Sequence, residues 1–343
     1  MGQRLSALLE WIEELRASLE VDIDDGWELQ PVSGDASFRR YFRVSSNGNS
    51  WIAVDAPPEH ENSKAFVEIA EAWRRQGVHV PKVISVDLKQ GFMLLSDFGD
   101  RLYLPALLEV GSEQLYRCAV DELFKIQQCE KDSLPHYDGA MLQREMSLFS
   151  EWFLERLLDV DLTSFDRGGL RVSFESLERS ALEQPLVCVH RDFHSRNLMV
   201  TSEDAPGIID FQDAVKGPIT YDLVSLFRDC YISWPDDEVY AWVEQFRAGL
   251  IVKGQLSDDV SIASFERWFD LMGMQRHLKA IGIFARLSIR DDKHSYLRDI
   301  PRTLKYIIAV CGKYPELSLF KEIIDLKVVP AMRAVRHFDD VSL

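Results

Sequence analysis

The chain has 343 residues, of which 46% are hydrophobic, so it can bury a sizeable core in two substantial parts. Acidic side chains outnumber basic ones by 56 to 39, and the formal net charge of −17 argues against a nucleic-acid backbone as the main partner. The five cysteines are scattered and odd in number, without CxxC spacing, and therefore predict neither a disulfide framework nor a zinc site.

The first 20 residues predict an amphipathic helix rather than a targeting segment. Apolar residues recur there at helical spacing, at Leu5, Leu8, Leu9, Ile12 and Leu15. Acidic residues interrupt the segment, which is not typical of a signal peptide. Because no uncharged apolar run approaches membrane-spanning length, we expect a cytoplasmic protein without a membrane partner.

Short strands are predicted next, followed by helices. Apolar alternation and turn residues indicate strands at 28–32, 40–44, 51–54, 83–86 and 92–95, with an Asn47-Gly48 hairpin turn and one helix at 62–76. Beyond residue 97, helical periodicity predominates at 115–128, 144–158, 174–183, 221–230, 237–253, 261–289 and 303–311. This order predicts an α+β fold with a small β-rich part and a larger helical part.

Two segments in the middle of the chain carry the chemistry. Residues 189–197 read Val-His-Arg-Asp-Phe-His-Ser-Arg-Asn, and residues 208–212 read Ile-Ile-Asp-Phe-Gln. The order His-Arg-Asp-x-x-x-x-Asn, strand, turn, strand, Asp-Phe is typical of a kinase active site. We predict that Asp192 orients an attacking hydroxyl and accepts its proton, while Asn197 and Asp210 hold Mg²⁺ on the phosphates of ATP. Any one of them alone could be a turn former or a helix cap.

A small-residue loop between two predicted strands is the candidate cover for the ATP phosphates. It consists of Gly34, Asp35, Ala36 and Ser37. Small side chains let backbone N–H groups approach anionic oxygens, and a serine hydroxyl adds a donor. The same four residues would also suit an ordinary hairpin. Their position ahead of the catalytic segments favours nucleotide binding.

The strand after this loop lacks an expected cation. Kinase strands of the form Val-Ala-Ile-Lys carry a lysine for the α- and β-phosphates, whereas residues 52–55 read Ile-Ala-Val-Asp. We place the compensating charge at Arg43, with Arg39 and Arg40 as alternatives, although each would also suit a solvated strand face. On the following helix, Glu68 has the place of the usual carboxylate partner, or is simply exposed.

The motifs resemble the aminoglycoside phosphotransferase family of the protein-kinase-like superfamily, as does Gly-Pro-Ile-Thr-Tyr-Asp-Leu at 217–223. Segments 34–43, 54–59 and 91–100 are similar to a bacterial branch that includes the anomeric N-acetylmuramate/N-acetylglucosamine kinases of peptidoglycan recycling. The resemblance implies a bilobal protein-kinase-like fold, with lobes at 1–96 and 97–343, and makes the missing lysine a feature of the branch. It also implies ATP and Mg²⁺, phosphorylation of a C1 hydroxyl, and a structural role for Asp222.

Acceptor contacts follow from the same resemblance. A small-molecule amino sugar is the expected partner, with Asp213 on its hydroxyls and Arg228 or Arg276 on a lactyl carboxylate, for which a guanidinium is well suited. Each of these residues could instead form a helix-surface ion pair. Two other functions stay open, namely a kinase for an aminoglycoside, choline or homoserine, and a nucleotide-binding regulatory module without catalysis. The sequence makes no prediction of the oligomeric state.

Overall fold

The computed structural model describes residues 3–15, 28–32, 38–46, 48–203 and 205–338. The predicted nucleotide loop, Gly34 to Ser37, and Asn47 of the predicted hairpin turn lie outside these ranges. The chain forms two compact units, which we call unit 1 (Met1–Lys125 with Asn197–Gln212) and unit 2 (Ile126–Arg196 with Asp213–Leu343). The predicted lobe boundary between residues 96 and 97 is placed where strands give way to helices. The two units are instead defined by which residues lie close to one another in space. That boundary stays a prediction.

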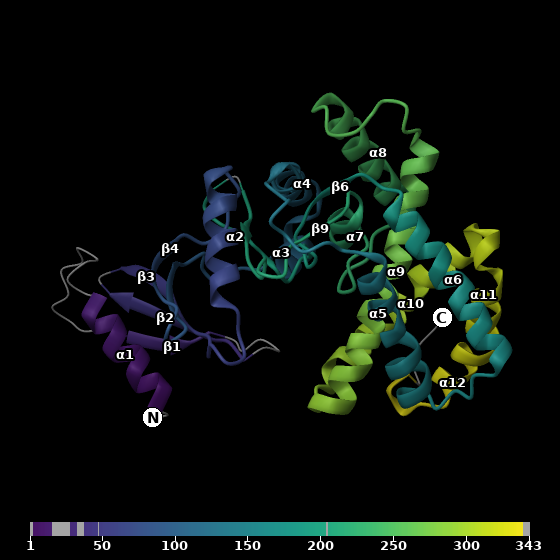
Figure 1. Cartoon of the computed structure of the whole chain (residues 1–343), viewed down its shortest axis with the longest axis horizontal. Helices are drawn as coiled ribbons and strands as arrows, with labels where there is room; N and C mark the ends of the chain where they lie inside the picture. The colour runs from purple at the N-terminus through teal and green to yellow at the C-terminus, as the bar shows by residue number, and fades with distance from the viewer. Residues whose placement is uncertain (1–2, 16–27, 33–37, 47, 204, 339–343) are drawn as a thin grey trace. The chain divides into compact units, whose positions relative to one another are not determined.

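Unit 1 is built on a five-stranded antiparallel sheet with the strand order β1-β2-β3-β5-β4 (Figure 1). The strands are β1 (Glu28–Pro31), β2 (Arg40–Ser46), β3 (Asn49–Asp55), β4 (Val83–Asp87) and β5 (Phe92–Ser96). In the β2–β3 register, Arg43 lies opposite Ile52. Successive side chains of a strand point to opposite faces, and the alternation of polar and apolar residues in β2 places Phe42 and Val44 in the core. All five predicted strands are confirmed.

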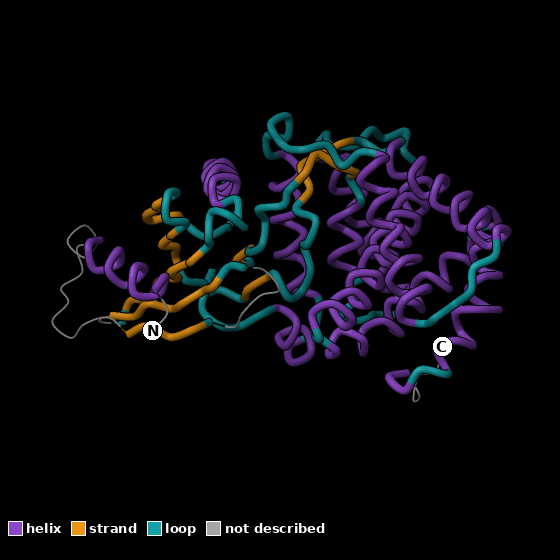
Figure 2. The backbone as a smooth tube through the Cα atoms, turned by 60° about the horizontal axis from the view of Figure 1, so that its bottom comes forward, coloured by secondary structure: helices purple, strands orange, loops and turns teal. Residues whose placement is uncertain are grey.

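Two helices of unit 1 show the amphipathic pattern that the sequence predicts. Helix α1 (Gln3–Leu15) lies beside the strands in Figure 2. Its residues Leu8, Trp11 and Ile12 join one hydrophobic cluster with sheet residues Phe42, Val44, Ala53, Phe92 and Leu94. Helix α2 (Ser63–Arg75) begins after Asn62, whose side chain accepts a hydrogen bond from the Ala65 N–H at 3.1 Å and caps the helix.

Unit 1 is completed by segments from further along the chain. Helix α3 (Tyr103–Val110), which we did not predict, is followed by α4 (Glu113–Gln128). The chain then leaves unit 1 and returns as a short hairpin of β7 (Leu198–Met199) and β8 (Gly207–Ile208). This returning hairpin carries two of the predicted site residues.

Unit 2 is mainly helical, as Figure 2 shows by its purple tubes. Its helices are α5 (Gly139–Leu148), α6 (Ser164–Leu182), α7 (Tyr221–Phe227), α8 (Asp236–Val252), α9 (Ile262–Asp291), α10 (Ile300–Lys313), α11 (Ser318–Ile323) and α12 (Val329–Arg333). Strands β6 (Leu186–Val189) and β9 (Val215–Pro218) form a second antiparallel pair. Residues 269–279 of α9 are all buried, which makes α9 the central helix of unit 2.

The fold class is confirmed as α+β, with local differences. The predicted helix at 144–158 is α5 followed by a π-helix over Phe149–Leu157, and the predicted helix at 174–183 is the second half of α6. Among the helices in the described ranges, none is both long enough and apolar enough to cross a membrane.

Candidate active site

The two predicted metal ligands lie together in unit 1, at the open end of the β7–β8 hairpin. Asn197 directly precedes β7, and Asp210 follows β8 by two residues. The Ile209 N–H donates a hydrogen bond to the Asn197 carbonyl oxygen at 3.1 Å, which extends the hairpin pairing to this end. The Asn197 Nδ2 donates to the Asp210 carboxylate at 3.3 Å, and the Gln212 Nε2 donates to its other oxygen at 2.7 Å.

The backbone of Asp210 is anchored by the residue that follows it. Asp210 has a φ of +65°, in the left-handed region that aspartate tolerates better than most residues. Phe211 is fully buried, and its ring centroid lies 4.7 Å from that of Phe66 and 5.7 Å from that of Trp73, both on α2. The unusual backbone conformation is thus held by aromatic packing, which fixes the direction of the Asp210 carboxylate.

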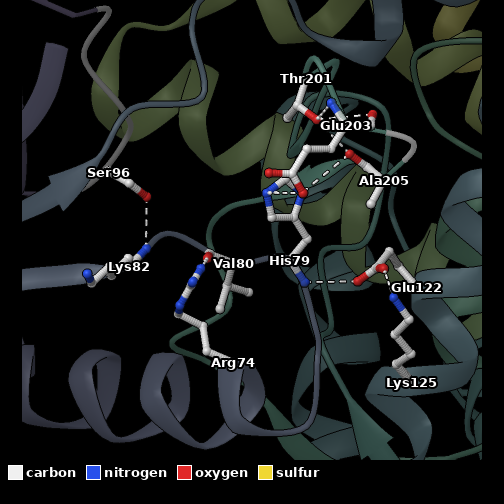
Figure 3. Close-up of polar contacts among 10 residues, drawn as sticks. All are labelled: Arg74, His79, Val80, Lys82, Ser96, Glu122, Lys125, Thr201, Glu203 and Ala205. Carbon is white, nitrogen blue, oxygen red and sulfur yellow. Dashed lines mark hydrogen bonds and ion pairs between the residues drawn. The ribbon is translucent and has the colours of Figure 1, made fainter. Parts of the chain in front are cut away.

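Figure 3 shows how the segment between α2 and β4 supports this hairpin. The His79 N–H donates to Glu122 at 2.9 Å, and the His79 carbonyl accepts a hydrogen bond from the Ile208 N–H at 2.9 Å. Its ring Nδ1 lies 3.3 Å from the carbonyl oxygen of Ala205. At Gly207 a Cβ atom would lie 2.4 Å from the ring of Phe98, so only glycine fits there. The hairpin ahead of Asp210 is therefore rigidly supported.

The donor atoms of this pair fit magnesium. The described part of the chain contains no group of three or more His, Cys, Asp or Glu side chains that could hold a metal ion by themselves. Asn197 and Asp210 offer an amide oxygen and a carboxylate. Mg²⁺ is commonly bound by one or two such oxygen ligands together with substrate phosphates. The site thus suits an ion that arrives with a nucleotide.

Asp192 lies in unit 2, in the loop that follows β6. The carboxylate of Asp222, at the start of α7, accepts hydrogen bonds from the backbone N–H groups of His190 at 2.6 Å and Arg191 at 3.0 Å. Arg191 has a φ of +80°, which is uncommon for a residue with a long side chain, and these two bonds hold it there. Burial raises the pKa of Asp222 to about 7. The structural role expected for Asp222 is confirmed.

Cations surround the half-buried carboxylate of Asp192. Burial alone would raise the pKa of Asp192, but the positive charges of Lys279 and Arg276 on α9 hold it well below its usual range. Arg191 contributes in the same direction. The group is therefore ionised at neutral pH, where it can accept a hydrogen bond from a hydroxyl but is a weak base.

A buried carboxylate that the sequence analysis missed connects these cations. Glu145 on α5 is only 7% exposed, and one of its oxygens accepts from Arg191 while lying 3.4 Å from the Nζ of Lys279. Its other oxygen accepts a hydrogen bond from the hydroxyl of Tyr137. Lys279 also donates to the hydroxyl of Tyr221 at 3.2 Å. The available signal was a charged residue on the apolar helix face of Leu142, Met146 and Phe149, because a buried charge requires a partner.

The arginines predicted near the nucleotide are all ion-paired, and the side chain of Arg40 is also 47% exposed, as the alternative of a solvated strand face expects. Arg43 binds Asp97 at 2.6 Å and Asp100 at 2.7 Å, after the end of β5. Arg40 pairs with Asp55, and Arg39 pairs with Glu61 at 3.1 Å. Glu68 is exposed and lies 3.6 Å from Lys64 on the same helix. A nucleotide contact by Arg43 stays a prediction.

The three predicted acceptor residues have different environments. Asp213 is exposed. Arg228 is buried, forms a 2.7 Å ion pair with Asp236, and has its guanidinium 5.3 Å from the centroid of the Tyr306 ring. Arg276 is buried on α9, and its charge lowers the pKa of Asp192. Arg276 is therefore the one that the structure associates with the predicted catalytic aspartate.

A phosphotransferase is the class of protein that these motifs and this fold define. Residues 28–256 match the model of a phosphotransferase enzyme family, and the chain belongs to that family. The resemblance predicted from the motifs is thus confirmed.

Individual relatives agree with this assignment. The chain is 43% identical over 317 residues to the N-acetylmuramate/N-acetylglucosamine kinase of Pseudomonas aeruginosa, a match that covers 89% of this chain and 92% of that protein. It is 42% identical over 333 residues to the protein of the same name from Pseudomonas putida, covering 94% and 96%. An ADP-bound aminoglycoside phosphotransferase superposes with a TM-score of 0.54 at 13% identity, covering 87% of this chain and 97% of that one. The predicted protein-kinase-like fold is therefore confirmed.

Proposed function

We propose that the protein is an ATP-dependent sugar kinase that transfers the γ-phosphate to the anomeric C1 hydroxyl of N-acetylmuramate, N-acetylglucosamine or both. The observation that carries this proposal is the similarity, over about nine-tenths of the chain, to kinases named for these two sugars. The product, a sugar 1-phosphate, would be used in the cytoplasmic recycling of cell-wall sugars. A small amino sugar is thus the proposed substrate.

Asp192 would orient the acceptor. Its ionised carboxylate accepts a hydrogen bond from the C1 hydroxyl and points the oxygen at the γ-phosphorus, in line with the bond to ADP. As the new O–P bond forms and the bond to ADP breaks, the hydroxyl proton passes to Asp192. Because the pKa of Asp192 is low, this transfer occurs late, when the oxygen has already lost electron density to phosphorus. A hemiacetal hydroxyl is more acidic than an ordinary alcohol, so a weak base such as the Asp192 carboxylate can accept its proton late in the transfer.

Asn197 and Asp210 would hold Mg²⁺, and their mutual hydrogen bond and the Gln212 contact keep the carboxylate oriented before the nucleotide arrives. When bound, the ion neutralises charge on the β- and γ-phosphates during transfer. Gly34, Asp35, Ala36 and Ser37 are proposed to cover these phosphates. Of the acceptor residues, Arg276 is proposed for the lactyl carboxylate of N-acetylmuramate because its charge is close enough to lower the pKa of Asp192. Asp213 and Arg228 are proposed for the remaining sugar contacts.

The test is a phosphorylation assay of the purified protein with ATP, Mg²⁺ and each sugar separately. We expect a sugar 1-phosphate, identified by phosphorus NMR and by loss of the reducing end. A panel of choline, homoserine and an aminoglycoside serves as the comparison. Turnover on a panel member without turnover on either sugar would refute the acceptor assignment and leave a kinase. ATP binding without transfer to any acceptor would favour the regulatory alternative.

A further inference from the structure

Lys279 joins three helices of unit 2 around the loop that bears Asp192. Its Nζ lies 3.4 Å from the carboxylate of Glu145 on α5 and donates a hydrogen bond to the hydroxyl of Tyr221 on α7 at 3.2 Å. Lys279 itself belongs to the buried stretch of α9. Lysine is almost never buried in this way unless its charge is paired. These polar contacts therefore fix the position of the ammonium.

Each of the two contacts leads to the backbone of the catalytic loop. Glu145 also accepts a hydrogen bond from the guanidinium of Arg191, which directly precedes Asp192. Tyr221 directly precedes Asp222, whose carboxylate accepts the two backbone N–H groups ahead of Asp192. The loop needs such support because Arg191 has a φ of +80°. Loss of the ammonium would loosen both connections.

The same ammonium supplies charge where the Asp192 carboxylate is half-buried. Burial lowers the pKa of the ammonium, but Tyr221, Glu145 and Asp192 together outweigh burial and hold this pKa above its ordinary value. In turn, Lys279 is the largest of the charges that oppose the effect of burial on the pKa of Asp192. Each of the two groups therefore helps to keep the other ionised.

The neighbouring cation of α9 suits a different task. Arg276 precedes Lys279 by about one helical turn, and it donates to the Sγ of Cys230 at 3.8 Å. We have proposed Arg276 for the lactyl carboxylate of the acceptor. Lys279, by contrast, contacts two groups that support the catalytic loop. Its contacts therefore favour a role in holding Asp192 rather than in binding the acceptor.

We propose that Lys279 is a positioning residue whose ammonium, fixed by Glu145 and Tyr221, keeps the Asp192 carboxylate ionised and aimed at the acceptor hydroxyl. This inference rests on the proposed function, in which Asp192 orients the acceptor. Lys279 acts through Asp192 and makes no contact of its own with the reacting atoms. A fixed charge of this kind needs no reorganisation during the transfer.

The test compares the steady-state kinetics of Lys279→Met, Lys279→Arg and Lys313→Met. Lys313 is the matched control, because it pairs with the buried carboxylate of Asp270 at 2.7 Å and donates to the hydroxyl of Tyr240 at 3.4 Å, also within unit 2. We expect Lys279→Met to lower the kcat by about 10- to 100-fold and to leave the KM for ATP within about threefold. Lys279→Arg should recover part of the loss. Lys313→Met should lower the Tm and leave the kcat within about twofold.

A double-mutant cycle distinguishes positioning from a general loss of packing. If Lys279 acts through Asp192, then Lys279→Met should change the residual kcat of Asp192→Asn by less than about twofold. A purely structural contribution would lower the kcat by the same factor in both backgrounds, and this result would overturn the inference. Should Lys279→Met fail to fold, Tyr221→Phe removes one contact of the ammonium and is subjected to the same cycle with the same two outcomes.

Amide hydrogen exchange of residues 190–196 tests the positioning without an acceptor. We expect faster exchange in Lys279→Met than in Lys313→Met, and equal exchange in the two variants would overturn the inference. Faster exchange in a protein that phosphorylates neither sugar would support the role of Lys279 in the loop and refute the sugar assignment. Sugar phosphorylation at an undiminished rate by Lys279→Met would overturn the inference and leave the proposed function intact.

Discussion

Replacing Glu145 with glutamine removes a negative charge that Arg191 and Lys279 share in the interior of unit 2. Breaking a buried ion pair by neutralising one partner costs about 3–5 kcal/mol, because the remaining charges stay buried without compensation. Glutamine keeps an oxygen that can accept from Arg191, so we expect a loss near about 3 kcal/mol. For a cooperative unit of about 200 residues, this lowers the Tm by roughly 6–12 °C.

The same carboxylate predicts a pH dependence with a definite sign. Burial opposes ionisation of Glu145, but Lys279 and Arg191 outweigh it and hold its pKa below the usual value. A depressed pKa in the folded state contributes stability that is present above the unfolded pKa of about 4.3 and lost as the pH falls through the folded pKa. The difference in Tm between the wild type and Glu145→Gln should therefore be complete at pH 7 and shrink below pH 4.

Thermal denaturation followed by circular dichroism measures this effect, and kinetics test its consequence for catalysis. Since Arg191 neighbours Asp192 in the chain, we expect the kcat to fall by about 10- to 100-fold. The control is Glu151→Gln, whose carboxylate is 46% exposed in a 2.9 Å pair with Arg156 and should contribute less than about 1 kcal/mol. Equal Tm values for the two variants, or a Tm difference that widens on acidification, would refute the reasoning.

Three further predictions concern the site and the sheet. Asp192→Asn should lower the kcat by roughly 10²- to 10⁴-fold and leave ATP affinity within about threefold; near-normal turnover in a steady-state assay would contradict the proposed role. Removal of divalent metal by EDTA should abolish transfer, and Asp210→Asn should raise the Mg²⁺ concentration needed for half-maximal rate by about tenfold or more in a Mg²⁺ titration; an unchanged midpoint would exclude Asp210 as a ligand. Asp55→Lys should not restore a nucleotide cation but should destabilise the sheet by about 3–5 kcal/mol, because it places a third positive charge beside Arg4 and Arg40; a gain in ATP affinity at unchanged Tm would disprove this.

Local pattern was sufficient to predict the strands and the order of the site residues. The alternation in β2 and the helical periodicity at 62–76 depend only on neighbouring residues, and both predictions are confirmed by β2 and by α2 over Ser63–Arg75. Asn197 and Asp210 lie close together because they flank the two strands of a short hairpin, β7 and β8. The residues between 197 and 210 are sufficient to form such a hairpin. These features required no information about distant contacts.

Other features depend on residues that are far apart in the sequence. Glu145 and Lys279 meet only because α5 and α9 pack together, so no local pattern could pair them. Arg43 could be placed on a strand, but its partners Asp97 and Asp100 come from beyond β5.

Two helical boundaries were missed for local reasons. In the π-helix, the Leu158 N–H donates to the carbonyl oxygen of Phe153, five residues earlier, at 3.0 Å. An α-helix and a π-helix can be formed by the same residue types, so the composition of this stretch did not indicate the change. The beginning of α6 has a capping box of Thr163 and Asp166, which the glycines at 168 and 169 obscured.

The return of Asn197–Gln212 to unit 1 has a consequence for the order in which the protein can mature on the ribosome. Until residue 211 has been synthesised, Phe66 and Trp73 lack the ring that packs against them. Helix α2 therefore emerges early, but its ring contacts with Phe211 form only after the roughly 70 residues between the two segments of unit 1 have been made. Formation of the Asn197–Asp210 pair, which we propose holds Mg²⁺, is by the same reasoning a late event in biogenesis, and a split of the gene after codon 125 would separate the sheet from the carboxylate of Asp210.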